Sequence, residues 1–113
     1  MGLKQKVPFL RWSVWRFALG LPGMVKTGQI GDGREQACAA FVEQNARQGD
    51  VDDVLSAIDD FAYNKSMLMN VGDEKGALLD AAVRRADPRL VLELGTYCGY
   101  GALRLARAAP AAR

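Results

Sequence analysis

The sequence predicts an α/β chain that is mostly helical, with a single strand at about residues 90–94. Two observations support this class of fold. Segments at about 34–47, 51–65 and 73–86 carry apolar or small residues at helical spacing, between residues that start and end helices. The short apolar run 90–94 instead leads at once into a glycine-rich turn and a further helix at about 101–109. That pattern is typical of a central strand in a parallel sheet.

Length and composition indicate one soluble domain. The chain has 113 residues, of which 50% are hydrophobic and 25% charged, as in globular rather than disordered proteins. The most apolar N-terminal run, 9–22, contains two arginines and is too short to span a bilayer. It also lacks the features of a secretory signal. We therefore expect a cytoplasmic protein, with residues 1–30 forming an amphipathic extension and linker and residues 31–113 forming the domain.

Charge and cysteine usage exclude several classes of function. Residues 1–30 carry five Lys or Arg and no acid, whereas residues 31–60 carry eight acids. Because no dense basic patch with interleaved aromatics is present, we predict no nucleic-acid partner. There is no histidine, and Cys38 and Cys98 lack C-x-x-C spacing, which argues against zinc binding and histidine-assisted nucleophilic catalysis. Both cysteines are expected to be reduced thiols that pack as small hydrophobes.

The N-terminal extension predicts a short helix over residues 8–19. Pro8 favours its start, and Gly20 and Pro22 are expected to end it. The residues expected to share one side are apolar, with two tryptophans toward the flanks: Phe9, Leu10, Val14 and Phe17. A basic helix of this kind can lie on a membrane surface; the alternative is packing on the domain or on a second subunit. Residues 20–33 are interpreted as a linker.

Three further helices are predicted in the domain. Asp32 is expected to cap the first and Asp50 the second, while Asp87–Pro88 ends the third. The predicted inner face of the first consists of Ala37, Ala40, Phe41 and Ala46. That of the second consists of Val54, Leu55, Ile58 and Phe61, and that of the third of Leu78, Leu79, Ala82 and Val83. The acids at the second helix start, Asp50, Asp52 and Asp53, suit the helix dipole and are interpreted as solvated rather than metal-binding.

The glycine loop after the predicted strand carries the chemistry. Glu93, Gly95 and Tyr97 lie at the carboxyl end of the strand, where parallel α/β sheets bind ligands. The glycines at 95, 99 and 101 follow G-x-x-x-G-x-G, which argues against a dinucleotide site. A wide loop after a carboxylate suits a zwitterion, whose carboxylate meets backbone N–H groups and whose ammonium is favoured by Glu93. A purely structural corner is the alternative, with Tyr97 and Tyr100 packing on the sheet rather than flanking a ligand.

Two longer motifs give this loop a family context. The segments Met69–Gly76 (MNVGDEKG) and Leu90–Gly101 (LVLELGTYCGYG) closely resemble the catechol O-methyltransferase family. The likeness extends upstream to Gly31–Gln36 and Val54–Asp59 and covers about residues 31–113. It implies the N-terminal portion of a Rossmann-like, class I methyltransferase fold.

The resemblance implies an enzyme that transfers a methyl group from S-adenosylmethionine to a hydroxyl of a catechol-like small molecule. In the family, Mg²⁺ holds both substrate hydroxyls and a lysine assists proton removal. Val71 would contact the methionine carboxylate through its backbone, and Met69 would border the methyl-transfer region. Glu93 and Gly95 would orient the amino-acid end of the cofactor, with Tyr97 beside it.

The sequence departs from the family pattern at the site and in extent. Gly101 falls at a cofactor position usually held by serine, and Met67 at a tryptophan that gates the substrate in the animal enzymes. The family's metal ligands and catalytic lysine lie on later segments, and the match places Asp73 and Lys75 at a helix start. We therefore assign no catalytic and no metal residue, and expect a truncated chain that does not catalyse alone. The alternative function is a non-enzymatic helical module that binds a membrane or partner through residues 8–19.

Overall fold

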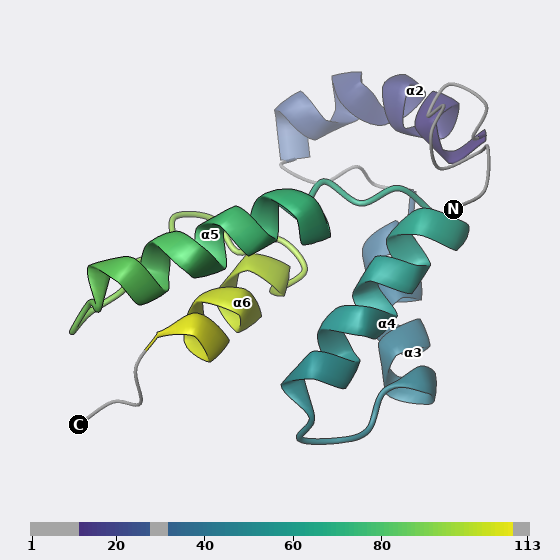
Figure 1. Cartoon of the computed structure of the whole chain (residues 1–113). Coiled ribbons are helices and arrows are strands. Elements are labelled where there is room, and N and C mark those ends of the chain that lie inside the picture. Colours follow the sequence, from purple (N-terminus) through teal and green to yellow (C-terminus); the bar gives the residue numbers. More distant parts are fainter. Residues whose placement is uncertain (1–11, 28–31, 110–113) are drawn as a thin grey trace.

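The computed structural model describes residues 12–27 and 32–109, and these form helices with no strand among them. In chain order the helices are α2 (Trp12–Thr27), α3 (Arg34–Asn45), α4 (Val51–Asn64), α5 (Gly72–Ala86) and α6 (Tyr100–Ala108). The main helix packings are α3 on α4, α4 on α6 and α5 on α6 (Figure 1). Within the described residues, the predicted helices are therefore confirmed, whereas the predicted strand of the α/β fold is not formed.

Helix α4 is the element that the sequence predicted best. The Asp50 carboxylate accepts a hydrogen bond from the backbone N–H of Asp53 at 3.0 Å, so the predicted cap is confirmed. The predicted inner face is buried or packed against the core. The core joins this face to α3, α6 and the segment after α4, and its buried members are Cys38, Leu55, Ile58, Phe61, Leu68 and Tyr100.

Helix α3 turns a different face to this core from the one predicted. Ala37 and Ala40 are exposed, while Cys38 is buried and Phe41 and Val42 pack on the cluster. The larger side chains contribute more buried apolar area than alanine does, so they determine which face turns inward. The helix starts after Gly33, which has φ 79°, and Asp32 lies one residue before that cap and accepts the Arg34 backbone N–H at 3.2 Å.

Helix α5 also differs from its predicted face. Leu78 is 74% exposed, whereas Val83 is buried as expected, together with Gly76 and Asp80. The cause is an ion pair with α6: both Asp80 carboxylate oxygens accept hydrogen bonds from Arg104, at 3.1 and 2.7 Å. Pairing the buried Asp80 carboxylate stabilises the fold more than burial of one further leucine would, because an unpaired buried charge carries a large free-energy cost.

The predicted strand at 90–94 is wrong as a paired element. Residues 90–94 carry no ladder, and Leu90, Leu92 and Leu94 are 86%, 80% and 88% exposed. A strand exists only when a neighbour receives its N–H and C=O groups, and no such neighbour lies among the described residues. The other side of this segment packs near α6, where Val91 and Glu93 line a cavity with Ala102 and Leu105.

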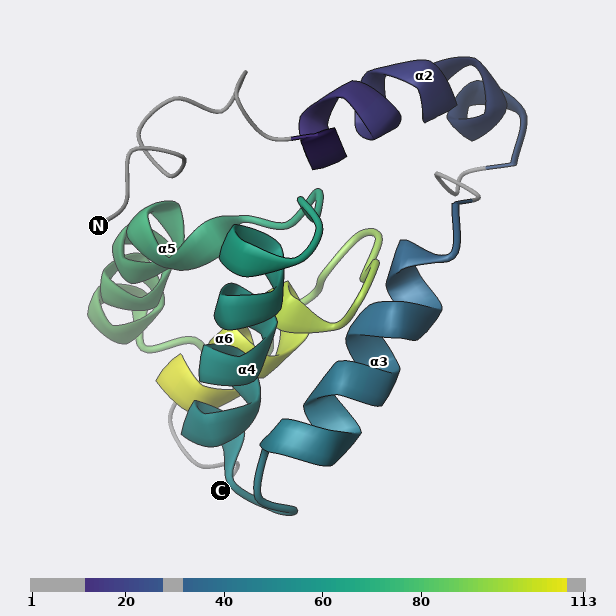
Figure 2. The ribbon, with the colours of Figure 1, turned by 90° about the vertical axis from the view of Figure 1, so that its right-hand side faces the viewer.

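Helix α2 is longer than predicted at its C-terminal end. It continues through Gly20 and Pro22 to Thr27, so the linker prediction fails over residues 20–27. Pro22 lies inside the helix and does not end it, although an interior proline removes a backbone hydrogen bond. Of the predicted inner residues, Val14 is half-buried, and Phe9 and Leu10 lie outside the described residues. Figure 2 shows α2 as a separate ribbon above the bundle, and no helix in the described ranges is long and apolar enough to cross a membrane.

Candidate functional site

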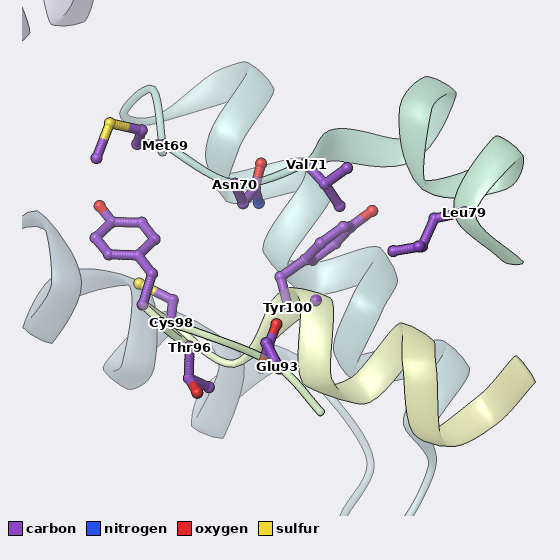
Figure 3. A pocket seen from close by; sticks show the side chains of 11 residues that line it. Met69, Asn70, Val71, Leu79, Glu93, Thr96, Cys98 and Tyr100 are labelled. Carbon is purple, nitrogen blue, oxygen red and sulfur yellow. The ribbon is translucent and has the colours of Figure 1, made fainter. Parts of the chain in front are cut away.

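A cavity of about 180 Å³ lies between the segment before α5 and the loop before α6. Its walls come from residues 69–71, from Leu79 on α5 and from the segment 93–101 (Figure 3). All six residues predicted to contact the cofactor line it: Met69, Val71, Glu93, Gly95, Tyr97 and Gly101. Two motifs that are far apart in the sequence therefore meet at one cavity.

Glu93 supplies a carboxylate with unused hydrogen-bonding capacity. Its Oε2 atom is buried and accepts no hydrogen bond within the described residues. Its Oε1 atom lies beside Gly101, where a Cβ would come within 2.4 Å of it. The missing side chain at 101 therefore gives the carboxylate room beside the first turn of α6, where negative charge is favoured.

The loop before α6 has the backbone of a tight turn. Gly95 and Gly99 have φ of 84° and 80°, the left-handed region that glycine adopts without strain. Tyr97 also has positive φ, at 49°, and is unusual for a non-glycine residue. The backbone N–H of Gly99 donates to the Thr96 carbonyl at 2.9 Å. The turn thus brings the loop directly to the helix N-terminus, where backbone N–H groups can meet an anion.

The two loop tyrosines have different surroundings. Tyr97 is partly exposed, and its hydroxyl donates to Glu35 on α3 at 3.2 Å. Tyr100 is 1% exposed, and its hydroxyl donates to Asp59 at 3.0 Å and accepts from Arg104 at 2.9 Å. Burial and the bond to Asp59 raise the pKa of Tyr100 to about 12. Tyr100 is therefore a core residue whose ring forms part of the cavity wall.

Sequence reasoning missed most of the other residues of the cavity wall. Asn70 is the most informative, because its buried Nδ2 donates no hydrogen bond within the described residues. Its position between Met69 and Val71, at the bend before α5, was the available signal. The other lining residues that were not predicted are Leu79, Thr96 and Cys98, whereas Tyr100 was expected either to flank a ligand or to pack on the sheet.

The segment that carries Met69 is held in place by Arg34 at the start of α3. The Arg34 guanidinium is buried and donates to the Met67 carbonyl, and also to both carboxylate oxygens of Asp32. A side-chain hydrogen bond from Arg34 lowers the pKa of Asp32. This arginine therefore ties the wall of the cavity to another helix.

Met67 itself lines a second, neighbouring cavity of about 140 Å³. Asn70 belongs to both cavities. The rim of the second includes Asp73, whose carboxylate accepts a 2.6 Å hydrogen bond from the Tyr63 hydroxyl. Asp73 thus bridges α4 and α5, and no group of three or more potential metal ligands occurs in the described ranges.

The first cavity has groups that suit the two charges of a zwitterionic ligand. It combines a carboxylate for an ammonium group, an unpaired amide donor, and the start of a helix for a carboxylate. A glycine loop at a helix start that follows an acidic residue is typical of cofactor sites in α/β proteins.

Comparison with known proteins relates the chain to the O-methyltransferases. No family model matches the chain. Over 96 residues, 85% of its length, it is 69% identical to a probable O-methyltransferase of Mycobacterium tuberculosis. It is 49% identical to the catechol O-methyltransferase of Mus musculus over 81 residues, 72% of the chain. With catechol O-methyltransferase B of Danio rerio, the identity is 51% over 77 residues, 68% of the chain.

The chain is therefore homologous to the catechol O-methyltransferases over most of its length, which confirms the resemblance. It spans only part of these relatives: 41% of the mycobacterial protein, 31% of the mouse protein and 29% of the zebrafish protein.

Proposed function

We propose that this chain is part of an S-adenosylmethionine-dependent O-methyltransferase and forms the end of the cofactor site that holds the methionine group. The observation that carries the proposal is the meeting of Met69–Val71 with Glu93–Gly101 at one cavity, in a chain 69% identical to a probable O-methyltransferase. Both segments come from the motifs that resemble the family.

The proposed contacts follow from charge. The unused carboxylate oxygen of Glu93 accepts from the ammonium group of the methionine end. The backbone N–H groups at the start of α6 and the backbone of Val71 receive its carboxylate. Met69, 48% exposed at the rim, shields the sulfonium side from water. Gly95 and Tyr97 shape the wall between these groups.

The size of the cavity supports binding of one end of the cofactor. Sites that enclose a whole ligand of drug size are roughly 300–1,000 Å³, and this cavity is about 180 Å³. When bound, S-adenosylmethionine supplies the methyl group for a hydroxyl of a catechol-like acceptor. The described residues offer no metal-ligand group, so no step through Mg²⁺ is assigned to this chain. We expect no methyl transfer by the 113-residue chain alone.

The alternative function, a non-enzymatic helical module, has less support as the role of the whole chain. The homology covers 85% of the sequence, and both segments that form the cavity belong to the motifs that resemble the family. Helix α2 contributes no residue to the proposed cofactor site.

Ligand-observed NMR tests the proposal. Saturation transfer from the 113-residue chain to S-adenosylmethionine should reach the methyl and methionine protons more strongly than the adenine protons. We expect weak affinity, with a Kd of the order of 1 mM, because one end of the ligand contributes only part of the binding free energy. Equal saturation along the whole ligand would contradict the proposed orientation.

Variants at two glutamates distinguish binding in the cavity from non-specific attraction to surface charge. Glu93→Gln should abolish the selective saturation, because the ammonium group loses its carboxylate partner. Glu74→Gln removes an exposed carboxylate at the start of α5 and should leave the pattern unchanged. Equal loss in both variants would show that charge alone attracts the ligand.

A further inference from the structure

Large apolar side chains are exposed in a row on α2. Trp12 is 71% exposed, Trp15 56% and Leu19 77%. Their spacing of i, i+3 and i+7 places them on the same face of the helix. Exposed apolar patches of this kind mark surfaces that contact a partner or a membrane.

Positive charge is concentrated on the same part of the chain. Residues 1–30 contain five Lys or Arg and no acid, whereas the next thirty residues contain eight acids. Arg16, next to Trp15 on α2, has a half-exposed side chain, and its guanidinium lies 3.6 Å from the Asp32 carboxylate. Each basic residue near an anionic membrane surface contributes about 1 kcal/mol of attraction. The sign of the charge therefore selects an anionic surface rather than an apolar protein groove.

The geometry of α2 favours lying on a membrane over crossing one. The helix has 16 residues, which at 1.5 Å per residue is about 24 Å, shorter than the ~30 Å hydrocarbon core. Its exposed stripe has tryptophan at two positions, the residue that prefers the membrane–water interface. Among the described helices, α2 takes no part in the main packings of the bundle (Figure 1), so its outer face is accessible.

We propose that α2 binds the surface of membranes that contain anionic phospholipids, with Trp12, Trp15 and Leu19 inserted at the interface. Cationic residues of the N-terminal segment attract the headgroups, and the apolar stripe enters the boundary with the acyl chains. The proposal is independent of the methyltransferase assignment, because it uses none of the residues of the cofactor cavity.

Intrinsic fluorescence tests this directly, because the only two tryptophans of the chain lie in α2. The full chain is mixed with vesicles of phosphatidylcholine and phosphatidylglycerol in equal parts, or of phosphatidylcholine alone. We expect a blue shift and co-sedimentation with the anionic vesicles, both reduced by added salt. No shift with either vesicle, or equal binding to both, would overturn the proposal.

Paired variants locate the contact. Trp12→Ala combined with Leu19→Ala keeps Trp15 as the fluorophore and should lower the partition coefficient by roughly tenfold or more. Leu78→Ala removes an equally exposed leucine on α5 and should bind as the wild type does. Circular dichroism checks that both variants keep their helices. If light scattering instead shows a dimer whose tryptophans are already shielded, a second copy covers the stripe and the membrane proposal fails.

Discussion

Asp80 and Arg104 form a buried ion pair, which Arg107 joins from a partly buried position. Asp80 is 4% and Arg104 7% exposed, and Arg107 adds a 2.7 Å hydrogen bond to the same carboxylate. The hydrogen bonds from Arg104 lower the pKa of Asp80, and those from Arg107 act in the same direction. Gly76 makes the arrangement possible, because a Cβ there would lie 2.4 Å from the Arg104 guanidinium carbon.

Asp80→Asn should strongly destabilise the helical bundle. The substitution leaves two arginines without their shared carboxylate, and removing one partner of a buried pair costs about 3–5 kcal/mol. Urea titration followed by circular dichroism measures the loss. Glu43→Gln changes an exposed carboxylate on α3 and should stay within about 0.5 kcal/mol of the wild type.

The pH dependence of this difference has a definite sign. The folded pKa of Asp80 lies below its ordinary value of 3.8, so its stabilisation is present above that value and is lost as the pH falls through the folded pKa. The gap between the wild type and Asp80→Asn should therefore narrow in acid. A gap that widens below pH 3.8 would contradict the assigned cause.

Hydrogen bonds between tyrosine hydroxyls and aspartate carboxylates join helix α4 to α5 and to α6. Tyr63 on α4 donates to Asp73 on α5, and Tyr100 on α6 donates to Asp59 on α4. The bond to Asp73 raises the pKa of Tyr63 to about 12, and burial with the bond to Asp59 does the same for Tyr100. Each bond depends on a protonated phenol.

Alkali should therefore loosen the bundle. Both phenols have folded pKa values above the ordinary 10, so their stabilisation is complete below pH 10 and is lost as the pH rises toward about 12. Helical circular dichroism and tyrosinate absorbance, followed together over this interval, measure the coupling. Tyr100→Phe should show a smaller alkaline loss than the wild type does.

The segment 90–94 exposes three leucines at alternate positions. Leu90, Leu92 and Leu94 are all more than three-quarters exposed, and an unpaired apolar edge promotes association between chains. Leu92→Lys should therefore reduce concentration-dependent association, measured by light scattering. Leu78→Lys places the same charge at an exposed position on α5 and should have little effect. Equal improvement in both variants would attribute the effect to net charge.

Periodicity and capping residues were sufficient to predict helices, but not always their inner faces. Leu55, Ile58 and Phe61 are buried as expected, because they recur at helical spacing on one face of α4. Leu78 was misplaced because Asp80 and Arg104, 24 residues apart, determine how α5 sits on α6. Motifs predicted the residues that share the cavity, whereas the unpaired Asn70 amide becomes evident only once the segment is folded.

The molecule as a whole is less compact than its length allows. Its radius of gyration is 15.2 Å, against about 13 Å for a compact domain of about this size. Helices pack on one side of the segment 90–94, and its other side carries the exposed leucines. In a parallel α/β fold both faces of a strand are covered. The homologous enzymes are also more than twice as long as the chain.

We expect the isolated chain to be only marginally stable. Few apolar side chains are buried in the described residues, and the backbone of 90–94 lacks partners for its polar groups. A low and broad urea transition, with binding of the dye ANS to exposed apolar surface, is the expected result. A sharp transition at high urea without ANS binding would show that the helices suffice.

The way the helices pair also predicts the order in which they fold. Helices α3 and α4 are neighbours in sequence, as are α5 and α6, so the contacts within each pair are local in sequence, which favours fast folding. Tyr100 then joins the pairs through its bond to Asp59. During synthesis on the ribosome, the leucines of 90–94 emerge before α6, and they stay accessible after the helices have packed. Newly made chains are thus expected to be chaperone clients through this segment.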